Sequence, residues 1–260
     1  MRTIIVTSAN RIATVTLNRP EARNAINTAM HEELTSFWLS FDRDPNLDVA
    51  ILTGAGEAFC AGADLKEYIP KWLSRTFQDV RDNVMHGLGG ITRGIRVKKP
   101  VIAAVNGWAL AGGFELALAC DVRIASDQAR FGSYEIHRGF HHGDGGIVRL
   151  VNSIGVSRTM DILFTGREIS AEEALSIGLV TRVVPAEALL GATQEYADNL
   201  VSKSQGALQS AKETVLEVVG KSMDQALKIE AIFGYSSGDT KYIEEQLNRF
   251  ASKNANRGEA

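Results

Sequence analysis

Apolar and polar positions in the first part of the chain alternate in runs that predict strands, loops and amphipathic helices. Residues 4–6 and 12–17 are rich in β-branched side chains and are separated by the polar run 8–11, which predicts an antiparallel hairpin. Pro20 cannot lie inside a central strand, so a loop is expected there. Apolar side chains at helical spacing then predict an amphipathic helix: Met30, Leu34, Phe37, Trp38 and Phe41.

Two further apolar runs, 48–54 and 100–105, predict buried strands. The first leads into 56–66, a loop rich in small residues whose amides can face a ligand. The second turns into an apolar helix at 112–120, and a short strand over 121–125 follows. This loose strand–strand–helix rhythm suggests a coiled β/α architecture, although composition alone allows a doubly wound sheet equally well.

Most of the remaining segments are predicted to be helical. Residues 71–95 fit a helix interrupted by glycines. Beyond residue 146, helices are expected over 148–154, 156–164 and 171–177, and a last strand over 179–184.

From about residue 187 the pattern changes to long amphipathic helices without strands. The chain therefore divides into a β/α core over 1–186 and a helical region over 187–260. The helical region carries more apolar positions than surface helices need, which predicts a lid, a subunit interface, or both.

Composition narrows the class of protein. The 260 residues are 45% hydrophobic and 23% charged, as in a globular protein, and no apolar run reaches the length of a membrane span. The net charge of −3 and the lack of a basic stripe argue against a nucleic-acid partner. The chain has two cysteines and starts without a secretory signal, so we expect a reducing compartment, the cytoplasm.

Two acids stand out as candidates for chemistry. Glu115 is the single acid in the apolar segment 112–120, where an unpaired charge would cost several kcal/mol. Glu135 follows the next predicted strand, and glycines at 143, 145 and 146 suit a backbone that approaches a ligand closely. Two carboxylates beside glycine-rich backbone suggest proton transfer next to an anion-binding site.

Several separated motifs, in the right order, resemble the enoyl-CoA hydratase/isomerase (crotonase) superfamily over nearly the whole chain. Each alone is weak, but together they are specific: NRPEARNA at 18–25, FCAGADLK at 59–66, PVIAAVNG at 100–107, GGFELA at 112–117 and LFTG at 163–166. The resemblance implies an α/β fold, a spiral of β-β-α repeats, with a C-terminal helical region that assembles homotrimers, often paired as hexamers.

The resemblance also implies the chemistry of an enoyl-CoA hydratase acting on an acyl-CoA thioester. The backbone amides of Ala63 and Gly112 match an oxyanion hole for the thioester carbonyl. Glu115 matches the acid that delivers water to Cβ, and Glu135 matches the acid that exchanges the proton at Cα. Isomerases of the superfamily commonly keep one of these acids, so the presence of both favours hydration.

The expected contacts with coenzyme A come mostly from backbone. They are assigned to Arg23, Ala61, Asp64, Leu65, Lys66 and Gly143, with the cations Arg23 and Lys66 near phosphates. Coenzyme A is part of the substrate, and no further cofactor and no metal are expected.

One segment departs from the pattern typical of hydratases. His137, His141, His142 and Asp144 stand where proline, aliphatic or small residues are usual. Hydrogen bonding within a loop is the simpler reading of the histidines, and zinc is disfavoured because adjacent His141 and His142 side chains tend to diverge. A titrating role in binding or proton transfer stays open, and Asp144 fits a glycine turn better than an extra acid.

These departures leave two alternatives to a straight-chain enoyl-CoA hydratase. One is another enolate-forming reaction on a polar or cyclic acyl-CoA, such as isomerisation, C–C hydrolysis or decarboxylation. The other, from a different class, is a non-catalytic acyl-CoA-binding subunit, which the presence of both acids and both donor loops argues against.

Overall fold

The computed structural model describes residues 2–67, 70, 73–82, 86–238 and 240–255. The chain forms two compact units, Met1–Asn199 and Leu200–Ala260. The strands end near the sequence-based boundary at 186, while the first unit also includes most of the next helix, α8 (Leu189–Val201). Within the described residues, no helix is both long and apolar enough to span a membrane.

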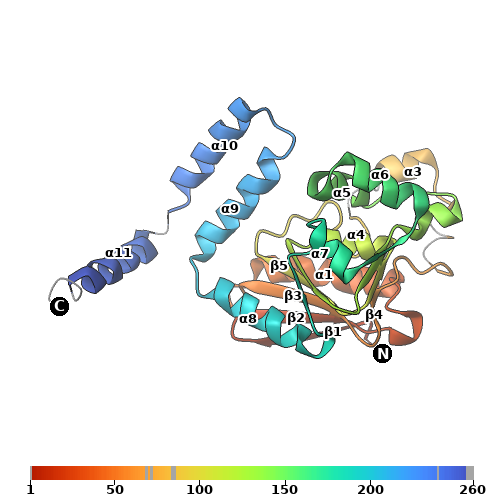
Figure 1. Cartoon of the computed structure of the whole chain (residues 1–260), viewed down its shortest axis with the longest axis horizontal. Coiled ribbons are helices and arrows are strands. Elements are labelled where there is room, and N and C mark those ends of the chain that lie inside the picture. The colour runs from red at the N-terminus through yellow and green to blue at the C-terminus, as the bar shows by residue number, and fades with distance from the viewer. Residues whose placement is uncertain (1, 68–69, 71–72, 83–85, 239, 256–260) are drawn as a thin grey trace. The chain divides into compact units, whose positions relative to one another are not determined.

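The first unit is built on a six-stranded sheet, shown in Figure 1. Its first two strands pair antiparallel as the predicted hairpin, and every other neighbouring pair is parallel. In spatial order the strands are β1 (Ile4–Ala9), β2 (Ile12–Leu17), β3 (Val49–Gly54), β5 (Val101–Val105), β7 (Val122–Ser126) and β10 (Arg182–Val184). The last of them covers only the end of the strand predicted over 179–184.

A second sheet of four short strands accompanies the first. It consists of β4 (Ala58–Cys60), β6 (Trp108–Leu110), β8 (Arg130–Gly132) and β9 (Glu168–Ser170). Three times the chain leaves a strand of the first sheet, adds a strand to the second and continues into helical structure. This repetition is the predicted spiral of β-β-α turns.

Apart from α3, whose described side chains are exposed, the helices of this unit pack on these sheets around one hydrophobic core. Helix α1 begins where the Asn27 side chain accepts a hydrogen bond from the Met30 amide, and it buries the predicted apolar face. Phe37 is half-buried at the edge of that face. The helices are α1 (Thr28–Arg43), α3 (Phe77–Asp82), α4 (Gly112–Ala119), α5 (Gly146–Ile154), α6 (Val156–Thr165), α7 (Ala171–Ser176) and α8, with short 3-10 turns η1 (Pro20–Ala22), η2 (Tyr134–Arg138) and η3 (Ala186–Ala188).

The helix predicted over 71–95 is wrong over its second half. Among the described residues of this range, Leu73 and α3 are helical, and 86–94 form turns and bends. Gly89, Gly90 and Gly94 adopt φ angles of 67°, 86° and 82°, which interrupt a right-handed helix. Residues 71, 72 and 83–85 lie outside the described part of the chain.

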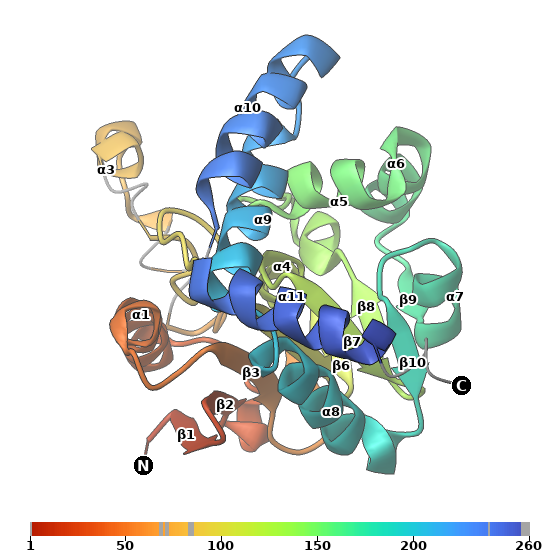
Figure 2. The same ribbon diagram turned by 90° about the vertical axis from the view of Figure 1, so that its left-hand side faces the viewer.

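The second unit consists of α9 (Gln205–Val218), α10 (Met223–Ser236) and α11 (Thr240–Ala255), as the amphipathic pattern predicts. Figure 2 shows α9 and α10 side by side, and the Ser210 hydroxyl of α9 donates to the Phe233 carbonyl of α10 at 3.2 Å. Large apolar side chains are exposed within this unit taken by itself: Val215, Leu216, Val219, Met223, Leu227, Ile232, Ile243, Leu247 and Phe250.

Candidate active site

Helix α4 starts from a strained residue. Ala111, its N-cap, has φ 50° and ψ −126°, a backbone conformation that is energetically unfavourable for any residue other than glycine. The strand side holds it, because the Ala111 amide donates to the Gly132 carbonyl of β8 at 2.8 Å. The helix side holds it too, because the Ala111 carbonyl accepts the amides of Phe114 and Glu115. Ala111 in this conformation forms the turn between β6 and α4, so Gly112 is the first residue of the helix.

The amides of Ala63 and Gly112 lie beside each other. A Cβ built on Gly112 would lie 3.5 Å from the Ala63 nitrogen, and one on Gly62 would lie 3.0 Å from the Gly112 nitrogen. Among the described residues, neither amide finds a hydrogen-bond acceptor. The structure therefore brings together the two amides that the sequence singles out.

The loop that carries Ala63 is fixed by the loop before α1. Ile26 donates to the Gly62 carbonyl at 2.7 Å, and Asp64 donates to the Ile26 carbonyl at 2.8 Å, so the two segments pair on either side of Ala63. The Ala61 amide adds a bond to the Arg23 carbonyl at 3.0 Å. The position of the Ala63 amide thus depends on residues nearly forty positions earlier in the chain.

The side chain of Asn24 fixes the loop before α1 through three hydrogen bonds. This side chain is fully buried, and its amide nitrogen donates to the carbonyls of Ala55 and Ala58 at 2.9 and 2.7 Å. Its oxygen accepts the Arg19 amide at 2.9 Å. Asn24 also holds φ at 56°, a conformation that asparagine tolerates better than most residues.

The residues predicted to contact coenzyme A gather on this same pair of loops. Arg23, Leu65 and Lys66 are exposed, and Ala61 is half-buried. Gly143 is exposed on a different loop, the one before α5, with open space around its Cα. The structure therefore groups five of the six predicted residues and separates Gly143 from them.

Asp64, the remaining member of this group, is committed to its own loop. Its carboxylate accepts the amides of Lys66 and Glu67 at 3.0 and 3.3 Å and pairs with Arg19 at 3.0 Å. Partial burial would raise the pKa of Asp64, but these donors outweigh it and the pKa is lowered. Asp64 therefore stabilises the loop that presents Ala63.

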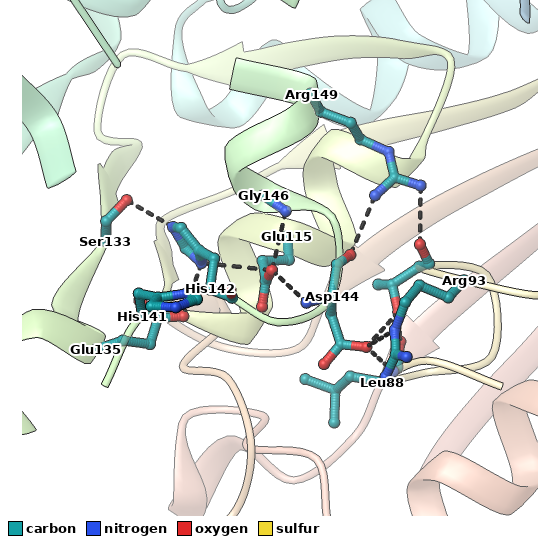
Figure 3. A network of polar contacts seen from close by, with 11 residues as sticks. Leu88, Arg93, Glu115, Ser133, Glu135, His141, His142, Asp144, Gly146 and Arg149 are labelled. Atoms are coloured by element: carbon teal, nitrogen blue, oxygen red, sulfur yellow. Dashed lines mark hydrogen bonds and ion pairs between the residues drawn. The ribbon is translucent and has the colours of Figure 1, made fainter. Parts of the chain in front are cut away.

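Glu115 is buried in the first turn of α4, with 3% of its surface exposed. Its Oε1 accepts the amides of Asp144 and Gly146 at 2.8 and 2.9 Å, as Figure 3 shows. The loop before α5 therefore wraps around this carboxylate and satisfies it with backbone donors.

His142 lies between the two glutamates (Figure 3). Its Nδ1 is 2.8 Å from Glu135 Oε1 and 3.5 Å from Glu115 Oε1, and its ring is buried. The contact with Glu135 is an ion pair rather than an aligned hydrogen bond, because Nδ1 has no partner of suitable angle. Its Nε2 lies 2.7 Å from the buried Ser133 hydroxyl.

The two carboxylates determine the charge of His142. Burial alone lowers the pKa of its imidazolium, but the contacts with Glu115 and Glu135 outweigh burial and raise the pKa to about 9. His142 is therefore the cation of this site at neutral pH.

One carboxylate oxygen of Glu135 is buried without a hydrogen-bond partner among the described residues. Glu135 sits in η2 with 4% of its surface exposed, and its Oε1 faces His142. Its Oε2 is buried and has no hydrogen-bond partner among the described residues. A buried carboxylate oxygen without a partner suits a group that exchanges a proton with a ligand.

The same three side chains are the candidate metal ligands. One ligand atom from each of Glu115, Glu135 and His142 lies within 4.8 Å of the others. The donor set fits an imidazolium better than an ion, since Nδ1 already contacts Glu135 and Glu115 Oε1 already accepts two amides. A metal would have to replace the proton on His142.

The other two histidines of this segment lie outside the site. His137 is exposed and its Nε2 is 3.0 Å from the Gly166 carbonyl, and exposed His141 contacts the His142 carbonyl through Nδ1 at 2.7 Å. Both are hydrogen-bonded loop residues, which was the simpler of the two sequence readings. Cys60 is fully buried, and burial raises the pKa of its thiol to about 12, so it is no nucleophile.

Asp144 uses its side chain to tie a second loop to the site. Its Oδ1 accepts from the Leu88 amide, the Thr92 hydroxyl and Arg93 Nε at 3.0, 3.2 and 3.0 Å. Leu88 is buried and its methyl group is the first atom that a Cβ at Gly112 would meet. The Asp144 carboxylate therefore bonds to a distant loop and not to its own glycine turn, and it fixes the backbone of Leu88, whose side chain covers Gly112.

Sequence reasoning missed the supports of the site. Asn24, Ser133, Leu88 and Arg149 act through partners in other segments, and only Asn24 lies in a motif that the sequence singles out, NRPEARNA at 18–25. Arg149 of α5 donates to the carbonyls of Asp144 and Thr92 at 3.1 and 2.9 Å. The usable signals were Glu115, a single acid in an apolar segment, and Glu135, an acid between a predicted strand and a run of glycines.

Comparisons with known proteins agree with this geometry. A family model described as enoyl-CoA hydratase/isomerase matches residues 7–257. A protein of Mycobacterium bovis named probable enoyl-CoA hydratase is 40% identical over 97% of this chain and 96% of its own. The (E)-benzylidenesuccinyl-CoA hydratase of Thauera aromatica is 41% identical over 83% of this chain and 82% of its own. The crystal structure of an enoyl-CoA hydratase from Bacillus anthracis superposes with a TM-score of 0.86 at 37% identity, covering 96% of each chain.

Replacing Asn24 by alanine should destabilise the protein. The change leaves two buried carbonyls and one amide without partners and puts a methyl side chain at positive φ. We expect the free energy of unfolding in urea to fall by about 3 kcal/mol. The exposed Asn46→Ala is the matched control and should change it by less than about 0.5 kcal/mol. Equal effects of the two substitutions would contradict the role given to Asn24.

Replacing Asp144 by alanine tests the link between the two loops. Three donors lose their common acceptor, so we expect a loss of about 2 kcal/mol in the free energy of unfolding. Asp144→Asn keeps an oxygen at the same place and should lose less. If asparagine costs as much as alanine, the charge pair with Arg93 carries the effect instead of the shared acceptor.

Proposed function

Because the chain belongs to the enoyl-CoA hydratase/isomerase family, we propose that it is an enoyl-CoA hydratase that adds water reversibly, in the syn sense, to a 2-enoyl-CoA. It is an enzyme of this kind, with an acyl-CoA substrate. One observation carries the proposal: the buried carboxylates of Glu115 and Glu135 lie close together, and Glu115 stands on the helix that begins at Gly112, one of two adjacent amides without acceptors among the described residues.

The amides of Ala63 and Gly112 would hold the thioester carbonyl oxygen. As water adds to Cβ, negative charge develops on this oxygen, and two N–H donors that need no reorganisation stabilise the enolate. A single such donor is typically worth about 3 kcal/mol of barrier. The strain at Ala111 and the pairing around Gly62 serve to keep both donors in place.

The two glutamates would handle the protons. Glu115 takes a proton from water while the water oxygen bonds to Cβ, and Glu135 delivers a proton to Cα. One O–H bond of water breaks, a C–O and a C–H bond form, and the carbonyl returns from the enolate. The unpartnered Oε2 of Glu135 supports its assignment to the Cα proton.

Coenzyme A would lie along the loops around residues 23 and 61–66. Arg23 and Lys66 are exposed cations there and suit phosphate groups, while Asp64 acts through its loop. The remaining predicted contact, Gly143, would come from the loop before α5. Since coenzyme A belongs to the substrate, the reaction needs no further cofactor.

The second unit and the composition support a proposal for the assembly and the location. The exposed apolar side chains of α9, α10 and α11 support a homotrimer or hexamer as the working state. We place this oligomer in the cytoplasm because both cysteines are free and buried.

The acyl group is expected to be bulkier or more polar than a straight chain. His142 places a cation beside the two acids, and a relative at about 40% identity is named for benzylidenesuccinyl-CoA. The runner-up reaction is another enolate-forming conversion of such an acyl group. Turnover of crotonyl-CoA beside (E)-benzylidenesuccinyl-CoA, followed by the loss of enoyl absorbance, ranks the two substrates.

Replacing either glutamate by glutamine should abolish most of the hydration. Each change removes a proton acceptor or donor with little change in shape, so we expect kcat to fall by a factor of about 10² to 10⁴. Binding of butanoyl-CoA by calorimetry should be unchanged. The exposed Glu172→Gln of α7 is the matched control. An isomerase would depend on only one of Glu115 and Glu135, and near-normal hydration by either variant would overturn the assignment.

Removing metal ions should leave the activity intact. The Glu115, Glu135 and His142 atoms are engaged with one another and with amides, so hydration relies on protons alone. We expect kcat within about 20% of its starting value after dialysis against EDTA. Loss of activity that Zn²⁺ or Mg²⁺ restores would show that the trio holds an ion.

A further inference from the structure

We propose that His142 is a positioning residue for the glutamate pair, holding on Nδ1 the proton that passes from Glu115 to Glu135 in each cycle. The inference rests on the proposed function, because the proton in question comes from the added water. It adds a third proton-carrying group to a reaction otherwise assigned to two acids.

Geometry gives His142 the right position for this task. A single ring nitrogen faces both carboxylates, at 2.8 Å from Glu135 Oε1 and 3.5 Å from Glu115 Oε1. Because Nδ1 is not aligned with either oxygen, its proton is not committed to one of them. A small rotation of the ring would move that proton from one carboxylate toward the other.

The ring is also held from every other side. Nε2 lies 2.7 Å from the Ser133 hydroxyl, and Phe114 meets the ring edge-on with centroids 6.3 Å apart. A Cβ at Gly146 would lie 2.7 Å from the ring, so only glycine leaves room for it there. The imidazole is thus confined to the space between the glutamates.

The charged groups around the ring favour its cationic form. Glu115 faces it from α4 and Glu135 from η2, while Arg149 of α5 is the opposing charge and interacts with Glu115. On its own loop, His141 is exposed and the Asp144 carboxylate pairs with Arg93. Two buried acids within reach outweigh one arginine, so the proton on Nδ1 is retained at neutral pH.

The proton balance of one cycle closes without any other reagent. Glu115 takes one proton from water as the C–O bond forms at Cβ, and Glu135 passes to Cα a proton that it receives from Nδ1 of His142. The neutral His142 then takes the proton from Glu115. All three groups return to their starting state, and the product contains both hydrogens of the water.

His142→Gln tests this relay, with His141→Gln on the same loop as the matched control. Glutamine can still hydrogen-bond but cannot carry a proton. In the variant we expect one fast turnover per active site, within about threefold of wild type, followed by a steady state slowed about 10²-fold, because the glutamates must then be reset by solvent. KM should change little, and His141→Gln should behave as wild type.

Two kinetic outcomes would overturn the inference while leaving the hydratase assignment intact. One is an unchanged steady state in His142→Gln. The other is a first turnover slowed as much as the steady state, which would make His142 a structural support only. Absence of turnover in wild type on crotonyl-CoA and (E)-benzylidenesuccinyl-CoA alike would instead count against the proposed function.

A second measurement does not depend on turnover or on the variant's activity. In ¹⁵N-histidine-labelled wild type, the His142 ring resonances, assigned by their loss in His142→Gln, should report an imidazolium at pH 7.5. They should titrate near the pKa of about 9 to which the glutamates raise it. A neutral His142 at pH 7.5 would overturn the inference in either case. Glu135→Gln should lower the titration midpoint, since it removes the carboxylate in closest contact.

Discussion

A carboxylate buried at the start of an apolar helix has to be compensated, and the loop between η2 and α5 takes its shape from that requirement. Glu115 receives two backbone amides from this loop, at Asp144 and Gly146, and the adjacent His142 cation. Without them the charge would cost several kcal/mol or be neutralised by a proton. The compensation also positions the other groups, because the same loop carries His142 between the acids and Asp144 against the Leu88 turn.

The half of the site that carries the Ala63 and Gly112 amides depends on backbone strain in place of charge. Ala111 is held at positive φ by hydrogen bonds to both sheet and helix, and Asn24 holds another positive φ beneath the Ala63 loop. Strain of this kind costs about 1 to 3 kcal/mol per residue and persists only where the surroundings enforce it. Here the surroundings are the two sheets, whose spiral brings residues 63 and 112 together. The fold thus places two backbone amides side by side, without any contribution from the side chains of these loops.

The sequence predicted the elements whose physical cause is local. The strands of the main sheet and the amphipathic helix α1 follow from periodicity, and Glu115 was conspicuous as one acid among apolar neighbours. The spiral was expected from the strand rhythm and the family motifs. The strands of the second sheet escape individual prediction, because each has three residues, too few for a pattern. The run 86–94 was misassigned because left-handed glycines outweighed helical spacing.

The histidines show why the rest of the site could not be read from the chain. His141 and His142 are neighbours with the same chemistry, yet one is exposed and the other is buried between two acids. The difference in their burial comes from groups outside the pair. The Ser133 hydroxyl and the Phe114 ring contact His142, and Gly146 leaves room for its ring because it has no side chain. These contacts, the amides on Glu115 and the Asp144 link all converge on one short loop, the loop between η2 and α5. A cation at this position of the loop has to compensate both carboxylates at once. His142 can do so because its Nδ1 faces both of them.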